Sequence, residues 1–510
     1  MLVTMVFTHT KILLTGLICF FVLFGLLIIG CNEPDHSTDL PAGTGQDQNS
    51  ISVPNPAASV LGEDAFVIFV TGNWQENLEP CGCSDKQLGG IDRRSHLLNV
   101  VPPQRRLLID AGILINQDSR QSQLKLETFL YSLKQLGYDA VSLTGPEIVL
   151  LNDVLALAPD QLPQLVVSNM SDSAQAEFSA VSYYRKTLQN KNHSLDCLVL
   201  GLADPAEVTG SGIADRLQLT DPLTALQETL IASGIEPDQS SPDELVIVTL
   251  SGNNDSLLSQ LRQITAIDLI VSPGYADEAE ILNHNHTSDL NRNRRLDQNE
   301  PLVVTPGKMG KYLARFVIAP EGPANLQAKN FTAIPVFDYY RKDPNIVSIV
   351  DAYQLQLQVE DLIRDELARP RQALPDGLSF VGSESCAATD CHADIYKKWK
   401  QFGHAWAMPT LVRAQRQFDP ECVQCHTVGM DYIGGYLSME QTPQFAAVGC
   451  EACHGPGSYH NQEPFEPYQE IFIPCEQCHN SEQSPEFDLH REEYFSKIQH
   501  WLDTQRRYWK

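Results

Sequence analysis

The sequence predicts an α/β domain followed by a smaller, mainly helical domain, and three observations support this fold class. Apolar runs of strand length alternate with amphipathic stretches from Asp64 to about Pro320, which is typical of a buried sheet covered by helices. Residues 345–369 carry apolar side chains at helical spacing, and Pro370 ends this predicted helix. From Ser379 on, the composition changes to Cys, His, Gln and Trp, which indicates a separate C-terminal domain.

The elements of the α/β domain follow from short apolar runs bounded by turn-forming residues, which predict strands, and from the amphipathic stretches between them. The predicted strands are Ala65–Val70, Arg106–Asp110, Ala140–Leu143, Leu165–Ser168, Cys197–Leu202, Leu245–Leu250, Leu269–Ser272, Leu302–Thr305 and Leu313–Ile318. The predicted helices include Gln121–Leu136, Pro222–Ser233 and Asp255–Ile264. We place the α/β domain at residues 63–340, a connecting helix and linker at 341–377, and the C-terminal domain at 378–510.

The chain is strongly acidic. Its 510 residues carry a formal net charge of −28, and the isoelectric point is ≈ 4.8. This charge argues against nucleic-acid binding, which needs a basic face to neutralise phosphates. It suits a protein that remains in an aqueous compartment and meets basic partners.

The N-terminus is predicted to be a targeting segment. Residues 12–30 are apolar apart from Thr15, and Gly30 precedes Cys31. This pattern resembles the lipobox of bacterial lipoproteins, which implies a signal peptide over residues 1–30, cleavage before Cys31 and lipid attachment to it. An uncleaved membrane anchor is the alternative, because about 20 apolar residues can span a bilayer. Either interpretation predicts a protein on the periplasmic or cell-surface side of a bacterial membrane, with residues 31–62 as a flexible tether.

One short motif, Cys–spacer–Cys–His, occurs four times in the C-terminal domain. Two thiols at this spacing reach two vinyl groups on one porphyrin edge, and the adjacent histidine binds the iron. Zinc and disulfides are the alternatives, but a zinc site does not require histidine directly after every second cysteine. The sequence therefore predicts four covalently bound c-type haems. The cysteines are Cys386 and Cys391, Cys422 and Cys425, Cys450 and Cys453, and Cys475 and Cys478, and the iron-binding histidines are His392, His426, His454 and His479.

The surroundings of these motifs resemble a known family. Ser383–His392 and Tyr396–His404 resemble the opening of the tetrahaem cytochrome c-554 family, partners of hydroxylamine oxidoreductase, and Val448–His460 resembles its most specific signature. The four-residue spacer of the first motif departs from the family pattern. The resemblance implies that His404 and His460 are distal iron ligands and that one haem is five-coordinate. His490 and His500 are the further candidate ligands.

The α/β domain resembles periplasmic 5′-nucleotidases and 2′,3′-cyclic phosphodiesterases in Phe69–Asn73, Leu108–Gly112, Leu136–Val141, Glu244–Thr249 and Gly307–Leu313. The resemblance implies a metallophosphatase-like αββα sandwich. In an approximate alignment, other residue types occupy the positions of the family's metal ligands, and of the ligand set only Glu147 remains. These positions are Asn73, Gln75, Ile113, Gly145, Pro146, Gly252, Gly274 and Ala276. Since two-metal hydrolysis needs the full ligand set, we expect no phosphatase activity.

Three other sequence features leave alternatives open. Cys81 and Cys83 form either a structural disulfide, with Cys197 as another partner, or a redox-active or metal-binding thiol pair. Residues 289–300 have the oxygen spacing of a calcium loop but lack its glycine, so a solvated hairpin is the alternative. His284 and His286 are expected at the surface.

These features predict electron transfer through four haems in an exported, lipid-anchored protein with redox proteins as partners. The alternative is a redox enzyme that acts on a small nitrogen or sulfur compound at a five-coordinate haem. A phosphohydrolase with an electron-transfer appendage is disfavoured by the altered metal-ligand positions. Membrane association through the N-terminal lipid or anchor is expected, and nucleic-acid binding is not.

Overall fold

The computed structural model places Pro54–Lys510 in one compact unit. The predictions for Cys31, for the pair Cys81 and Cys83, for His284 and His286, and for residues 289–299 lie outside the residues that the structure describes. No helix within the described residues is both long and apolar enough to cross a membrane. The described residues are 62, 64–80, 87–155, 161–209, 211, 213–240, 244–282, 300–319, 330–375, 377–388, 391–464, 473–480, 483–484 and 486–500.

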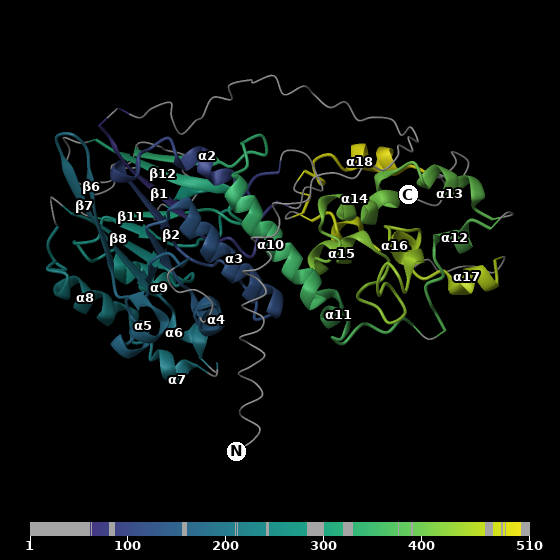
Figure 1. The fold of residues 1–510 in the computed structure, drawn as a ribbon, viewed down its shortest axis with the longest axis horizontal. Helices are drawn as coiled ribbons and strands as arrows, with labels where there is room; N and C mark the ends of the chain where they lie inside the picture. The colour runs from purple at the N-terminus through teal and green to yellow at the C-terminus, as the bar shows by residue number, and fades with distance from the viewer. Residues whose placement is uncertain are drawn as a thin grey trace, which may run out of the picture. The chain divides into compact units, whose positions relative to one another are not determined.

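Two mixed β-sheets form the centre of the N-terminal part (Figure 1). In the described residues, the first sheet has the strand order β13-β12-β1-β2-β3-β4-β5, and the second has the order β10-β11-β9-β8-β7-β6. The strands of the first sheet are β1 (Phe66–Thr71), β2 (Arg106–Asp110), β3 (Ala140–Ser142), β4 (Leu165–Val166), β5 (Ala180–Val181), β12 (Tyr312–Ile318) and β13 (Phe331–Pro335). Those of the second are β6 (Tyr184–Gln189), β7 (Ser194–Leu202), β8 (Glu244–Leu250), β9 (Leu269–Val271), β10 (Glu280–Ile281) and β11 (Leu302–Thr305).

The main hydrophobic core lies between the two sheets. Side chains of β1 and β2, such as Ile68 and Ile109, share one cluster with Ile247 of β8 and Val304 of β11. The other face of the second sheet packs against α8 and α9, which contribute Leu226 and Leu261, among others, to a second cluster. Every residue of β1 and of β2 is buried, so both faces of the first sheet are covered as well. This arrangement confirms the predicted αββα sandwich.

All nine predicted strands are present, with their ends shifted by at most three residues. Four further strands were not predicted, namely β5, β6, β10 and β13. In β6, exposed residues alternate with partly or fully buried ones, and its sequence YRKTLQ is mostly polar. Such short or polar edge strands lack the apolar run on which the prediction depended. Cys197, which we considered as a disulfide partner, is a free thiol buried in the core between the sheets.

The helices of the N-terminal part also match the prediction closely. α3 begins after Ser119, whose side chain accepts a hydrogen bond from the Ser122 amide, and ends at the left-handed Gly137. The helices are α2 (Arg94–Leu98), α3 (Arg120–Leu136), α4 (Gly145–Leu155), α5 (Asp172–Phe178), α6 (Pro205–Val208), α7 (Ala214–Leu217), α8 (Pro222–Ala232) and α9 (Asp255–Leu261), with 3₁₀ turns at Ile91–Arg93 and Pro103–Arg105.

The prediction of a single helix over residues 345–369 is wrong in one respect. The structure has two helices there, α10 (Pro344–Glu360) and α11 (Leu362–Leu367), separated by Asp361 with a φ of 55°. A left-handed residue interrupts the hydrogen-bond ladder of a helix. α10 packs along α3, and α11 contacts α15 (Figure 1).

The C-terminal part consists of short helices joined by turns, as predicted (Figure 1). A small core joins α11, α14 and α15, with Met408, Val423 and Tyr436 among its buried members. The helices are α12 (Ser383–Cys386), α13 (Ala393–Trp399), α14 (Ala407–Ala414), α15 (Pro420–His426), α16 (Glu451–His454), α17 (Ser458–Gln462) and α18 (Arg491–Ile498), with 3₁₀ turns η5 (Gly403–Trp406), η6 (Pro443–Phe445) and η7 (Cys475–Gln477).

Candidate functional site

The four Cys–spacer–Cys–His motifs lie on or beside short helical turns. α15 contains the whole second motif, from Cys422 to His426, and α16 contains most of the third motif. The first motif begins at the end of α12, and the fourth begins in η7. In a helical turn, residues three apart project to the same side, so both thiols of a two-residue-spacer motif face one partner. None of the eight motif cysteines forms a disulfide with another described cysteine.

The fold brings the motifs together in two pairs. The side chains of Cys386 and Cys450 lie next to each other, which joins the first motif to the third. Those of Cys425 and Cys478 do the same for the second and fourth motifs. These contacts connect residues that are more than fifty positions apart in the sequence. Groups bound at paired motifs would therefore lie close enough to exchange electrons.

Three of the motif histidines each face a histidine from outside the motifs. The ring centroids of His392 and His460 are 6.1 Å apart, those of His479 and His404 are also 6.1 Å apart, and those of His454 and His500 are 6.2 Å apart.

These three separations fit a metal ion held between each pair of rings. An imidazole nitrogen binds a metal at about 2.0–2.1 Å and its ring centre lies roughly 1 Å behind it, so two rings on opposite sides of one ion have centroids about 6 Å apart. The described residues thus suit bis-histidine coordination of an iron at three of the motifs.

The second motif differs from the other three. Among the described residues, His426 is the motif histidine without such a ring partner. Its Nδ1 lies 2.8 Å from the Ala407 carbonyl oxygen, to which a neutral ring donates. That bond leaves Nε2 available for iron, which is the usual orientation of a metal-binding histidine.

The two remaining candidate histidines have different surroundings. His500 faces His454, and its Nδ1 lies 2.8 Å from the Ile498 carbonyl oxygen. His490 is half exposed and lies 3.8 Å from the Glu493 carboxylate. The sequence could not distinguish the two histidines, because neither belongs to a local sequence motif. Both also lie far along the chain from the motif whose iron they could bind.

Burial keeps the ring nitrogens of the paired histidines available. Burial and the neighbouring rings of His479, His426 and His500 lower the pKa of His404 to about 4, so that its imidazole is neutral. Burial also lowers the pKa values of His392 and His479. The ring of His479 stacks on Phe487 at 4.8 Å between centroids, which fixes its orientation.

Glu451, between the two cysteines of the third motif, holds three segments together. Its carboxylate accepts hydrogen bonds from the amides of Val381 at 2.9 Å, Gly382 at 2.8 Å and Gly457 at 2.7 Å. The side chain is only 2% exposed. Since the first two amides precede the first motif and the third precedes His460, this buried carboxylate positions both members of the His392–His460 pair.

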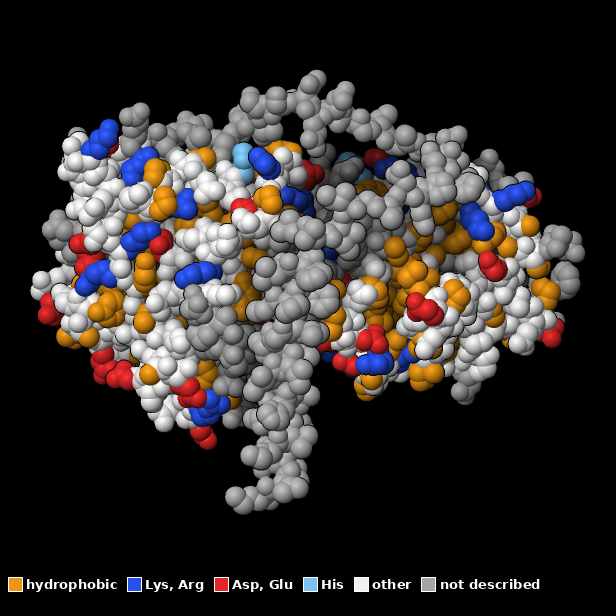
Figure 2. Space-filling model, in the orientation of Figure 1, with side chains coloured by type: hydrophobic (Ala, Val, Ile, Leu, Met, Phe, Trp, Pro, Cys, Tyr) orange, Lys and Arg blue, Asp and Glu red, His pale blue; other side chains and the backbone are white. Residues whose placement is uncertain are grey.

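Apolar side chains are exposed around the motifs. They include Trp406, Val412, Ile433, Met439, Tyr459 and Leu489. Figure 2 shows hydrophobic side chains gathered over the C-terminal helices. Exposed apolar surface of this kind is typical of ligand-binding regions, and a porphyrin ring is a large apolar ligand.

In the N-terminal part, the residues aligned with phosphatase metal ligands meet at one edge of the sheets. Asn73 Nδ2 donates to the Pro273 carbonyl at 3.4 Å, and Gln75 Nε2 donates to Asn73 Oδ1 at 2.9 Å. Asn253 Nδ2 donates to the Gly274 carbonyl at 3.3 Å. The described residues contain no group of three or more His, Cys, Asp or Glu side chains arranged to hold a metal ion.

The two buried carboxylates near this edge are engaged by the protein itself. Glu147 accepts hydrogen bonds from the amides of Leu114 and Thr144 and from the Thr144 hydroxyl, and burial raises its pKa to about 7. Asp110 accepts from Trp74 Nε1 at 2.7 Å and from the Thr71 hydroxyl at 2.6 Å, and burial raises its pKa. Their oxygens stabilise the loops after β1, β2 and β3.

Four Cys–spacer–Cys–His motifs with histidine pairs are typical of c-type cytochromes, and here they follow an α/β sandwich. Residues 385–455 match the family model "Cytochrome c554 and c-prime". Cytochrome c-554 of Nitrosomonas europaea is 34% identical over 101 residues, which cover 17% of this chain and 42% of that protein. Residues 385–455 are therefore similar to the cytochrome c554 family, and the chain spans less than half the length of this relative.

Two solved structures resemble part of this chain. A 5′-nucleotidase precursor from Thermus thermophilus aligns with a TM-score of 0.44 and 16% identity, covering 69% of this chain and 68% of that one. A calcineurin-like phosphoesterase from Bacillus subtilis aligns with a TM-score of 0.42 and 16% identity, covering 58% of this chain and 98% of that one.

Proposed function

We propose that this protein transfers electrons through four covalently bound c-type haems on the outer side of a bacterial membrane, to which Cys31 anchors it. The observation that carries this proposal is the set of three histidine pairs with centroids 6.1–6.2 Å apart, each joining a motif histidine to a distant one. Iron held by two imidazoles has no open position, which suits electron transfer rather than substrate binding. Redox proteins are the expected partners.

In this proposal each motif supplies two thioether cysteines and one proximal histidine. The distal ligands are His460 for the first motif, His500 for the third and His404 for the fourth. The contacts between Cys386 and Cys450 and between Cys425 and Cys478 support short electron paths within the two motif pairs.

The number of haems provides the first test. We expect a pyridine haemochrome assay and the intact mass of the exported protein to give four covalent haems, because each motif offers two thiols beside a histidine. A count of three would exclude the motif with the long spacer, Cys386 to Cys391. A protein without covalent haem would overturn the proposed function.

A second candidate function is redox catalysis at the haem of the second motif. The lack of a ring partner for His426 among the described residues favours it. A five-coordinate haem there would bind a small nitrogen or sulfur compound. We expect cyanide, nitrite, hydroxylamine or sulfite to shift the spectrum of one haem, and unchanged spectra would exclude this candidate.

We further propose that the α/β domain has no phosphatase role. The support is that Glu147 and Asp110 already accept hydrogen bonds from the surrounding loops. Chelator-sensitive turnover of nucleotides with added manganese would contradict it.

A further inference from the structure

α15, which carries the second motif, is held in place by side chains of the α/β domain. Asp419 caps this helix and accepts hydrogen bonds from Gln121 of α3 at 2.9 Å and Gln354 of α10 at 3.2 Å. Asp419 is three residues before Cys422 and is only 6% exposed. The α/β domain therefore contacts the beginning of the haem-attachment helix directly.

A buried lysine lies beside this contact. Lys125 Nζ of α3 is 2.6 Å from Glu421, the residue directly before Cys422, and 3.5 Å from Glu76. The Lys125 side chain is 5% exposed. Burial lowers its pKa, but the carboxylates of Glu421, Asp419 and Glu76 outweigh this effect and raise the pKa above its usual value. The lysine is thus cationic, and its charge neutralises part of the acidic end of α15.

The Glu76 side chain is held by hydrogen bonds from its own α/β domain. Its Oε1 accepts hydrogen bonds from the amides of Asn116 and Gln117 and from the Ser122 hydroxyl, at 3.2, 3.1 and 2.8 Å. Glu76 has a φ of 66°, and the same loop contains Asn73 and Gln75 at positive φ. A non-glycine backbone held in this region is strained and persists only when its surroundings determine it. This loop follows β1, where the phosphatase resemblance places metal ligands.

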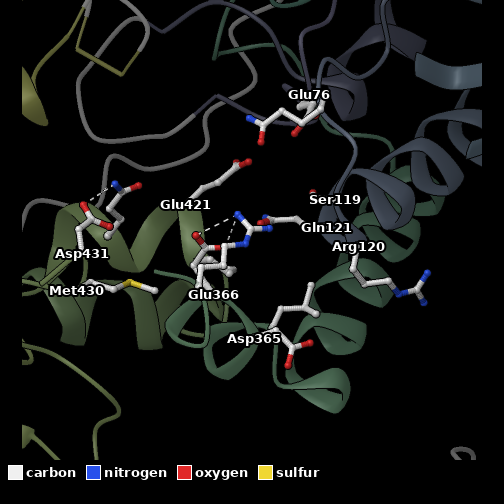
Figure 3. Close-up of a pocket in the computed structure, with 14 residues that line it drawn as sticks. Glu76, Ser119, Arg120, Gln121, Asp365, Glu366, Glu421, Met430 and Asp431 are labelled. Carbon is white, nitrogen blue, oxygen red and sulfur yellow. Dashed lines mark hydrogen bonds and ion pairs between the residues drawn. The ribbon is translucent and has the colours of Figure 1, made fainter. Parts of the chain in front are cut away.

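The other side of Glu421 faces solvent. A groove runs between the loop of Glu76, helix α11 and the beginning of α15, and Glu421 extends into it (Figure 3). The Glu421 side chain is 53% exposed there. Water in the groove can therefore solvate Glu421 when its lysine partner is replaced, so a Lys125 variant is expected to fold.

We propose that Lys125 is a positioning residue of the α/β domain that fixes α15 and raises the reduction potential of the haem at the second motif. This inference rests on the proposed haem function. A cation stabilises the reduced haem, which carries one less positive charge, and carboxylates stabilise the oxidised form. In a partly buried environment such charges act over several ångströms with little screening.

The test is a redox titration of the complete holoprotein, followed by optical and electron paramagnetic resonance spectra. In Lys125→Met we expect one of the four midpoint potentials to fall and three to stay in place, since Glu421 and Asp419 lose their cation. Lys125→Arg keeps the positive charge, so its midpoint potential should stay close to that of the wild-type protein. Lys134→Met, which removes an exposed lysine of the same helix, should leave all four potentials unchanged.

Glu421→Gln provides the second, opposite variant. Removal of this carboxylate should raise the same potential, and the double variant should return toward the wild-type value. Four attached haems with unchanged potentials in both single variants would overturn the inference while leaving the proposed function intact. If Lys125→Met fails to fold, an unchanged midpoint potential in Glu421→Gln would still overturn the inference. Absence of haem in the wild-type protein would instead remove the proposed function.

Discussion

Replacement of His500 with alanine is expected to convert one low-spin haem to a high-spin haem without loss of any haem. The ring of His500 is 6.2 Å from that of His454, so its removal would leave the iron of the third motif with one imidazole. The covalent thioether bonds at Cys450 and Cys453 would keep the haem attached. Electron paramagnetic resonance of the oxidised protein, together with the haem count, measures both effects.

His404→Ala and His460→Ala should each produce the same change at a different motif, since their rings face His479 and His392. His490→Ala is the matched control, because His490 lies beside Glu493 at the surface. Its spectrum should equal that of the wild type. If His490→Ala and not His500→Ala changes the spin state, the assignment of the distal ligand at the third motif is wrong.

Replacement of Glu451 with alanine is expected to destabilise the C-terminal domain by about 3–5 kcal/mol. The variant would leave the buried amide of Gly382 and the partly buried amides of Val381 and Gly457 without their acceptor, and each orphaned buried donor costs about 1–3 kcal/mol. Denaturant unfolding followed by the haem absorbance gives the free energy of unfolding. Because the three amides position the first motif and His460, the haem held between His392 and His460 should lose its low-spin signal before the other haems do.

Two variants make the Glu451 experiment specific. Glu451→Gln keeps one acceptor oxygen and should recover part of the lost free energy. Glu440→Ala removes an exposed carboxylate of the same domain and should change stability by less than about 0.5 kcal/mol. Equal stabilities of Glu451→Ala and Glu440→Ala would mean that the buried carboxylate does not hold the segments together.

Charged side chains of the α/β domain contact the C-terminal part of the chain. Two of its buried carboxylates, Asp110 and Glu147, are occupied by loop hydrogen bonds. Lys125, which also pairs with Glu76, contacts Glu421 of α15. Glu79 adds a further link, because its carboxylate binds Arg416 at 2.6 Å. In our proposals the sandwich therefore supports and tunes one haem rather than binding its own metals.

Much of the fold could be predicted from the sequence because its determinants are local. The strands β1, β2, β8 and β11 are short apolar runs, and a run of that kind must be buried wherever the chain places it. The edge strand β6 was missed because half its residues face solvent and are polar. The break at Asp361 was missed because apolar spacing continues across it, and the left-handed backbone there has no signal in the residue type.

The sequence by itself predicted which residues bind haem, since two cysteines and a histidine on one helical turn suffice for attachment and for the first iron ligand. Only the tertiary structure decided which distant histidine faces each of three motifs, and it distinguished His500 from His490. It also decided that Lys125 reaches the helix of Cys422, almost 300 positions away. The physical reason is the range of the interactions. Thioether attachment depends on residues within one turn, whereas ligand pairing and charge contacts depend on how separate segments pack, which no local pattern encodes.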